Sequence, residues 1–157
     1  MGSHYKGKRK KREQCMAEEK EELQKIAGNL CIGAYARHVF LCVGGKCASE
    51  QEGRAAWEQL KRELKDRNLS LSTKPSACYR SKVDCLRVCA GGPIMVVYPE
   101  GTWYSGMTAD RIPLFVEQHL EQGKPIEEWI FARNPLPAGA PMTGTCFGPR
   151  ADESAPG

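Results

Sequence analysis

Four of the eight cysteines form two close pairs that could hold a metal centre. Four residues separate Cys42 from Cys47, three separate Cys85 from Cys89, and 37 residues lie between the pairs. Thiolates are soft ligands, and four of them can satisfy either a zinc ion or an iron-sulfur cluster. Structural zinc sites usually use knuckles with two residues between paired cysteines. The longer spacings here therefore favour a cluster.

Glycines accompany both pairs, with Gly44 and Gly45 inside the first spacer and Gly91 and Gly92 after the second pair. Such backbone can wrap closely around a metal group and aim N–H groups at sulfur. A dithiol oxidoreductase is a weaker interpretation, because thioredoxin-type catalysis uses Cys-x-x-Cys and this chain has no such motif. No signal peptide is recognisable, so we expect a reducing, cytoplasmic compartment in which clustered cysteines act as ligands rather than disulfides.

The other four cysteines are less suited to ligation. We expect Cys15, Cys31 and Cys146 to be packed or ordinary thiols. Cys78 lies seven residues before Cys85 and is close enough in sequence to be a substitute ligand, a role that we consider minor.

The positive charge is concentrated at the start of the chain. Residues 1–12 contain six Lys or Arg and no acid, whereas the other 145 residues carry seventeen basic and nineteen acidic side chains. We interpret the run as a solvated, disordered arm. Nucleic-acid binding is not expected, because basic and aromatic residues are not interleaved, and no apolar stretch is long enough to span a membrane.

Periodicity places the two cysteine pairs between regular elements. The predicted elements are a charged helix over 15–30, a strand over 35–42, a helix over 50–66 capped by Ser49 and Glu52, a strand over 68–73, a ligand loop over 74–92, a hairpin over 94–104, and a helix over 108–123. This order predicts an α/β fold with a small mixed sheet flanked by helices. We divide the chain into a basic arm plus helix (1–34), a cysteine-bearing domain (35–133) and a disordered tail rich in Pro and Gly (134–157).

Residues from about 37 to 131 resemble the thioredoxin-like 2Fe-2S ferredoxins. The resemblance is carried by His38-Val39-Phe40-Leu41-Cys42, by Cys85-Leu86-Arg87-Val88-Cys89-Ala90-Gly91-Gly92-Pro93, by the segment 94–104, and by 116–120 followed by 123–126. It covers about three-fifths of the chain.

The resemblance implies a thioredoxin-like fold and a non-enzymatic electron carrier. It also implies one 2Fe-2S cluster per chain, bound by Cys42, Cys47, Cys85 and Cys89. The short first spacer is similar to that of the cluster-bearing subunit of complex I and of related NAD-linked and hydrogenase-type enzymes, so a non-catalytic subunit role is the alternative. That subunit has a multi-helix N-terminal extension, whereas this chain has room for one helix and an arm. A zinc-stabilised binding module is the third possibility.

Partner expectations rest on charge and on the family. Four basic residues lie inside or beside the ligand loops and could steer an acidic or flavin-containing redox partner: Lys46, Arg80, Lys82 and Arg87. Members of the family are commonly homodimers. We therefore expect a symmetric homodimer that uses the open hairpin edge and Trp103, with the two clusters far apart.

Overall fold

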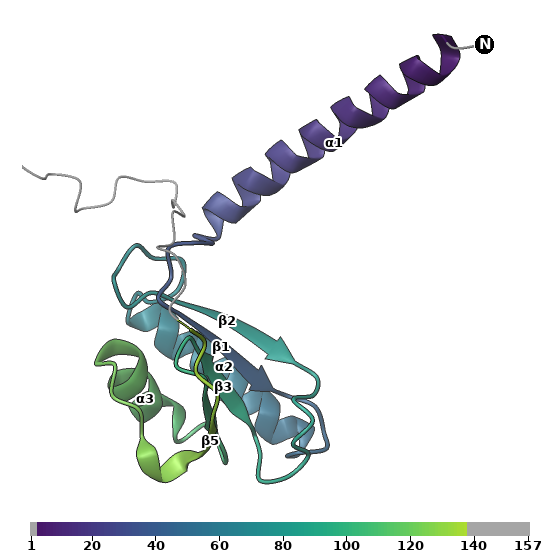
Figure 1. The fold of residues 1–157 in the computed structure, drawn as a ribbon. Helices are drawn as coiled ribbons and strands as arrows, with labels where there is room; N and C mark the ends of the chain where they lie inside the picture. The colour runs from purple at the N-terminus through teal and green to yellow at the C-terminus, as the bar shows by residue number, and fades with distance from the viewer. Residues whose placement is uncertain (1–2, 138–157) are drawn as a thin grey trace, which may run out of the picture.

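The computed structural model describes residues 3–137 and places a mixed five-stranded sheet beside two helices (Figure 1). The strands are β1 (Arg37–Cys42), β2 (Cys78–Val83), β3 (Met95–Tyr98), β4 (Thr102–Tyr104) and β5 (Ile130–Arg133). Their order is β2-β1-β3-β4-β5. β1 and β2 are parallel, and each of the other neighbouring pairs is antiparallel. The predicted α/β class with a small mixed sheet is confirmed.

Helix α2 (Glu50–Asp66) connects the parallel strands and occupies the predicted range. The Ser49 hydroxyl accepts from the backbone N–H of Glu52, while the Glu52 carboxylate accepts from the backbone N–H of Ser49, so the predicted capping box is present. Leu60 and Leu64 on its apolar face are fully buried against the sheet. The box fixes where the helix begins, directly after the first cysteine pair.

The C-terminal helical region packs against α2. It consists of α3 (Ile112–Phe115), which continues as the π-helical segment η1 (Val116–Glu121), and the 3₁₀ turn η2 (Glu127–Trp129) follows. These elements confirm the predicted helix over most of its length. Phe115 and Leu120 are fully buried in the core shared with α2.

The predicted strand over 68–73 is wrong. Asn68 and Leu71 have left-handed backbone angles, with φ of 54° and 50°, which an extended strand cannot contain. Leu69 is buried and its N–H bonds to the Leu64 carbonyl, so this segment closes the end of α2. The second strand is β2, which lies within the predicted ligand loop. As an edge strand with partly exposed polar side chains, β2 lacks the apolar alternation that would have revealed it.

The hairpin edge is also not open as predicted, because β5 pairs with β4. Residues just beyond β5 continue along the hairpin turn, where Asn134 N–H bonds to the Gly101 carbonyl at 2.8 Å. Gly101 has a φ of +61°, and a Cβ there would lie 1.9 Å from the Asn134 carbonyl oxygen, so glycine is required. The rest of the predicted disordered tail, residues 138–157, lies outside the described residues.

The first helix, α1 (Ser3–Asn29), projects away from the sheet (Figure 1). The basic run forms part of this helix and is not the separate arm that we predicted. Lys, Arg, Glu and Gln are good helix formers, and the ion pair from Arg9 to Glu13 at 3.0 Å joins the basic run to the following segment. No helix in the described part of the chain is long and apolar enough to cross a membrane.

The sheet face that points away from α2 is lined with aromatic rings. His38 and Phe40 stack at 3.9 Å between centroids, Tyr35 and Tyr79 stack at 5.2 Å, and His38 meets Tyr79 edge-on. All four are partly exposed, whereas Val39 and Leu41, on the other face of β1, are fully buried. The sheet therefore has one core face and one half-covered aromatic face.

A buried polar network joins the start of β1 to η1. The Ile126 N–H donates to the Tyr104 hydroxyl at 3.2 Å, and this hydroxyl lies 2.8 Å from Nδ1 of His119. Nε2 of the same ring lies 3.9 Å from the Glu100 carboxylate. Arg37 binds the same carboxylate at 2.7 Å. Burial of the His119 ring lowers its pKa to about 4, so the ring is neutral near pH 7.

This network predicts a loss of stability in mild acid. The pKa of His119 rises from about 4 in the folded chain to about 6.5 on unfolding, so the unfolded state binds the extra proton between these values. The free energy of unfolding should therefore fall by up to about 3 kcal/mol as the pH drops from 6.5 to 4. Urea titrations at each pH would measure it. His119→Gln should flatten the slope over this interval, and an unchanged slope would contradict the assignment.

Candidate metal centre

The four predicted ligand cysteines meet at one end of the sheet. Cys42 ends β1, and Cys47 follows in the loop to α2. Cys42 pairs in register with Val83 at the end of β2, and Cys85 and Cys89 come next in the loop to β3. Because parallel strands present their carboxyl ends at the same edge, the β1–α2 loop and the β2–β3 loop lie side by side.

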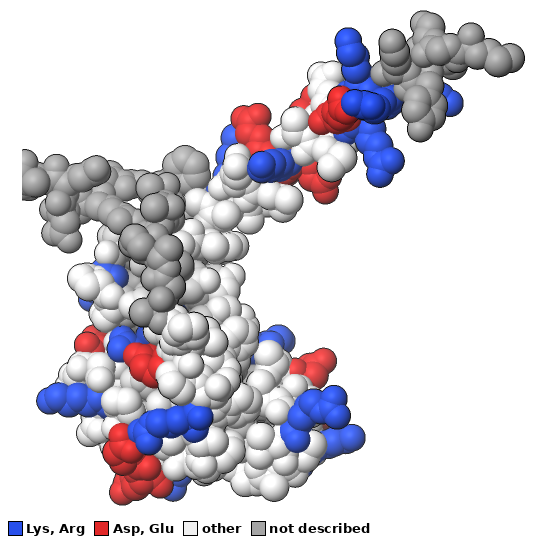
Figure 2. Space-filling view, in the orientation of Figure 1, with Lys and Arg blue, Asp and Glu red and all other residues white. Residues whose placement is uncertain are grey.

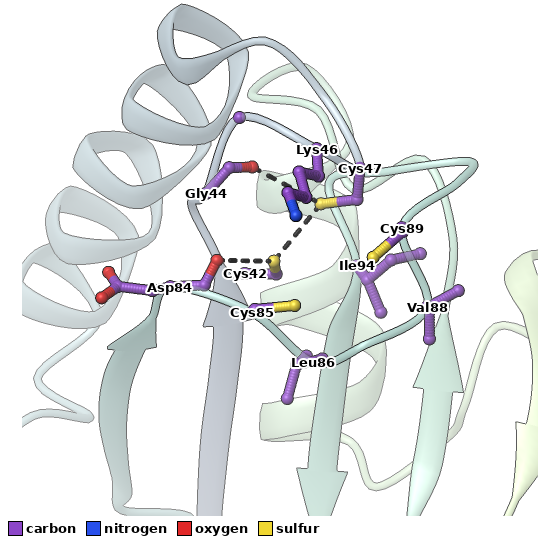
Figure 3. A pocket seen from close by; sticks show the side chains of 11 residues that line it. Cys42, Gly44, Lys46, Cys47, Asp84, Cys85, Leu86, Val88, Cys89 and Ile94 are labelled. Atoms are coloured by element: carbon purple, nitrogen blue, oxygen red, sulfur yellow. Dashed lines mark hydrogen bonds between the residues drawn. The ribbon is translucent and has the colours of Figure 1, made fainter.

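A cavity of about 230 Å³ opens between the two loops (Figure 3). It is lined by Cys42, Gly44, Gly45, Lys46, Cys47, Asp84, Cys85, Leu86, Val88, Cys89 and Ile94. The structure thus brings all four predicted ligands to a common cavity. Three apolar side chains, Leu86, Val88 and Ile94, complete its wall and limit the access of water.

The two sulfurs of the first cysteine pair lie close enough together to bind one metal atom. The sulfurs of Cys42 and Cys47 lie 3.3 Å apart, near the roughly 3.8 Å that a tetrahedral metal with 2.3 Å metal–sulfur bonds imposes on two thiolates. Their thiols also point at backbone carbonyls, that of Cys42 at Asp84 and that of Cys47 at Gly44 (Figure 3). Burial raises the pKa of Cys47, with the Cys42 thiol adding to the shift. Metal binding would release these protons.

The second pair lies at the more exposed side of the cavity, and an unusual backbone conformation positions it. Arg87 and Cys89 both have left-handed angles, with φ of 64° and 56°. The turn directs the N–H of Arg87 to the sulfur of Cys85 at 3.1 Å. Hydrogen bonds from backbone N–H groups to ligand sulfurs are one of the means by which a protein sets a cluster's reduction potential.

The donor set consists of two thiolate pairs that line one cavity. In residues 3–137, no three Cys, His, Asp or Glu side chains converge closely enough to hold a single metal ion. The cysteines instead form two pairs facing a shared cavity, which suits a group of two irons bridged by sulfide.

Two glycines allow the loops to make direct backbone contact. A Cβ on Gly44 would lie 1.8 Å from the Asp84 carbonyl oxygen, and a Cβ on Gly92 would lie 2.7 Å from the Cys47 carbonyl oxygen. The Gly92 N–H bonds to that same Cys47 carbonyl at 2.9 Å. Each ligand loop is therefore braced against the other. The sequence identified both glycines but did not indicate that Gly44 contacts Asp84, because this contact depends on the β1–β2 register.

The four predicted docking residues do not form one surface: two lie at the cavity, one lies in a neighbouring groove, and one points toward α2. Lys46 lines the cavity and Arg87 is exposed on the second ligand loop. Lys82 lines a neighbouring charged groove between α2 and β2. Arg80 points elsewhere, with its guanidinium 5.6 Å above the Trp57 ring and 2.8 Å from the Ser70 hydroxyl. Lys46 and Arg87 are thus the residues that can act directly at the cavity.

The remaining cysteines lie apart from the cavity. Cys78 begins β2, and the five residues that follow it place it about 17 Å from the ligand end of the strand. It is buried, and burial raises its thiol pKa to about 12. Cys15 is exposed on α1, and Cys146 lies outside the described residues. Cys31 is buried in the turn after α1, but it is disulfide-bonded and so is not the ordinary thiol that we expected.

Comparison with known proteins identifies relatives of this chain. No family model matches the chain. A 2Fe-2S ferredoxin of Clostridium pasteurianum is 34% identical over 97 residues, which span 57% of this chain and 90% of that protein. A 2Fe-2S ferredoxin of Aquifex aeolicus is 27% identical over 104 residues, spanning 64% and 94% respectively.

Solved structures that resemble this chain are also ferredoxins. A thioredoxin-like [2Fe-2S] ferredoxin from Aquifex aeolicus superposes with a TM-score of 0.55 at 24% identity, over 68% of this chain and all of that one. A wild-type structure of such a ferredoxin, also from Aquifex aeolicus, gives a TM-score of 0.54 at 26% identity, over 63% and 99%. Both comparisons therefore lead to 2Fe-2S ferredoxins. The chain belongs to the thioredoxin-like 2Fe-2S ferredoxin family.

Proposed function

We propose that this protein is a one-electron carrier that binds a single 2Fe-2S cluster through Cys42, Cys47, Cys85 and Cys89. The observation that supports the proposal most strongly is that both cysteine pairs line one cavity between two braced loops. When bound, such a cluster supplies a centre that accepts and releases one electron.

The chain's own residues would hold and shield this centre. Cys42 and Cys47 supply the closely spaced pair, and the second loop supplies Cys85 and Cys89. The Arg87 N–H donates to the Cys85 sulfur, which favours the more negatively charged state of the site. The apolar wall reduces contact with water, so electrons would leave at the exposed second loop.

Purification without oxygen, followed by a visible spectrum and by iron, sulfide and zinc analysis, tests this function. We expect two irons and two sulfides per chain, with charge-transfer absorption in the visible range. One zinc per chain in a colourless protein, without iron, would instead establish the zinc-binding module.

We further propose that the positive rim guides an acidic or flavin-containing partner. Lys46 and Arg87 flank the cavity, and exposed charges act on an approaching partner over roughly 8 Å at physiological salt.

The double variant Lys46→Glu, Arg87→Glu reverses the charge of this rim. At low salt, its reduced form should be oxidised about tenfold more slowly by the anion ferricyanide and faster by the cation hexaamminecobalt(III). Its reduction potential should also fall, because the added electron loses favourable interaction.

The matched control for this rim is Arg62→Glu, Lys65→Glu, which makes the same charge change near the far end of α2. It should leave both oxidation rates and the potential nearly unchanged. If rim and control variants behave alike, overall charge rather than the rim sets the rate.

We also propose that the protein assembles as a homodimer. The predicted hairpin edge cannot form the interface, since β5 covers β4. A homodimer would therefore use another surface.

A further inference from the structure

Helix α1 is an extended surface that packs against no other element among residues 3–137. Every residue from 7 to 26 is exposed, and the helix stands clear of the sheet (Figures 1 and 2). Isolated helices are marginal in water, and most helices in proteins are stabilised by packing one face. A 27-residue helix of this kind gains stability if another molecule covers part of it.

The charges of α1 are separated along its length. Residues 6–12 hold six Lys or Arg, and residues 13–22 hold five Glu and one Lys. Figure 2 shows basic side chains gathered toward the free end. This order opposes the helix dipole, which favours acidic residues near the N-terminus and basic residues near the C-terminus. Neither is present, because the first turn contains no acid and the last turn no base.

One side of α1 also exposes large apolar residues. Met16, Leu23 and Ile26 are 60%, 57% and 47% exposed. Their spacings of seven and three residues place them along a single stripe of the helix. The stripe lies on the half of α1 nearer the sheet, so an antiparallel pair centred on Cys15 would not align it with the same stripe of a second copy. Pairing of this kind would rest on the charges instead.

We propose that α1 pairs antiparallel with α1 of a second copy, forming the interface of the homodimer proposed above. Residues 8–12 and 18–22 are centred on positions 10 and 20, so an antiparallel pair about Cys15 aligns each basic segment with the partner's acidic one. The opposed dipoles of the two helices also attract each other. A parallel pair would instead align like charges.

This pairing explains both charge segments together. A nucleic acid or an anionic membrane would attract the basic segment but repel the five Glu that follow it. A second copy is complementary to both segments. Salt should weaken the pair, because its charges are exposed to solvent.

The pairing also leaves the cysteine cavity accessible. α1 enters the sheet at the start of β1, whereas the ligand loops follow the ends of β1 and β2 (Figure 1). The helix is about 40 Å long at 1.5 Å per residue. Two copies joined through α1 would therefore present their cavities at distant ends of the assembly.

Complementary charge reversal tests the interface in full-length protein with its cluster bound. One variant carries Lys8→Glu, Lys10→Glu and Lys11→Glu, and the other carries Glu18→Lys, Glu19→Lys and Glu22→Lys. By sedimentation velocity in low salt, each should dimerise at least tenfold more weakly than the natural chain. An equimolar mixture should restore the dimer, while Arg62→Glu, Lys65→Glu on α2 should leave dimerisation unchanged.

Cross-linking provides a second measurement that does not depend on helix charge. A short bis-maleimide should join two copies through Cys15, and Cys15→Ala should abolish that product. Circular dichroism would verify that each charge variant keeps its helix.

Different outcomes would overturn the homodimer and the α1 interface. A natural chain that stays monomeric overturns both the homodimer and the helix pair. Dimers that resist both reversals and lack the Cys15 product overturn the helix pair and leave the homodimer to another surface. A monomeric natural chain that binds duplex RNA through its basic segment would replace the pair with a nucleic-acid interface.

Discussion

Cys42→Ser should abolish or strongly distort the visible absorption of the purified protein and lower its iron content. Cys42 is only 4% exposed, and its sulfur lies 3.3 Å from that of Cys47, so this residue forms the closed side of the cavity. A serine hydroxyl is a harder and less acidic donor than a thiol, and it is a poor replacement in a thiolate set. Serine at Cys47, Cys85 or Cys89 should alter the spectrum as well.

Two other cysteines provide controls for this series. Cys15→Ser changes an exposed thiol on α1 and should leave spectrum and iron content intact. The spectrum of Cys85→Ser should not depend on whether Cys78 is also replaced, because Cys78 lies at the far end of β2. Equal damage from Cys15→Ser and Cys42→Ser would refute the ligand assignment.

Gly44→Ala should be almost as harmful, although it removes no ligand. The added methyl would lie 1.8 Å from the Asp84 carbonyl oxygen, which belongs to backbone, so the two ligand loops must separate. We expect loss of most bound iron and a fall in unfolding free energy of about 1–3 kcal/mol, the usual cost of overpacking. Iron analysis and urea unfolding would measure the two effects.

The neighbouring glycine supplies a matched comparison. A methyl on Gly45 would meet the flexible Glu50 side chain at 3.3 Å, which can move aside. Gly45→Ala should therefore retain both iron and stability. If both substitutions are tolerated equally, the backbone contact between the loops does not control cluster binding.

Local sequence patterns predicted the helices, because capping residues and apolar spacing depend on neighbours in the sequence. The capping box at Ser49 and Glu52 located the start of α2, and apolar spacing located the helix that contains Phe115. β2 and β5 were missed because both are edge strands with few buried side chains, so their order depends on pairing with neighbours. The basic segment was misread because its helix continues from the sequence that follows it.

In the candidate site, too, features set by local spacing were predictable, whereas contacts between distant residues were not. Spacing alone marked the two cysteine pairs, since ligand geometry requires short intervals within each pair. The brace between Gly44 and Asp84 could not be predicted, because it joins residues forty positions apart through the β1–β2 register. Arg80 was assigned to the docking rim by sequence proximity, but alternation along β2 turns its side chain toward Trp57.

The mutual bracing of the two ligand loops has a consequence for the speed of electron exchange. A carrier transfers an electron quickly when its surroundings need little rearrangement as the charge changes. Here the Gly92 N–H is already bonded to the Cys47 carbonyl, and the Arg87 N–H already points at the Cys85 sulfur. Dipoles fixed in advance need not reorient when the charge arrives. The close backbone contacts thus favour a low reorganisation energy, so that the driving force and the approach of the partner would set the rate.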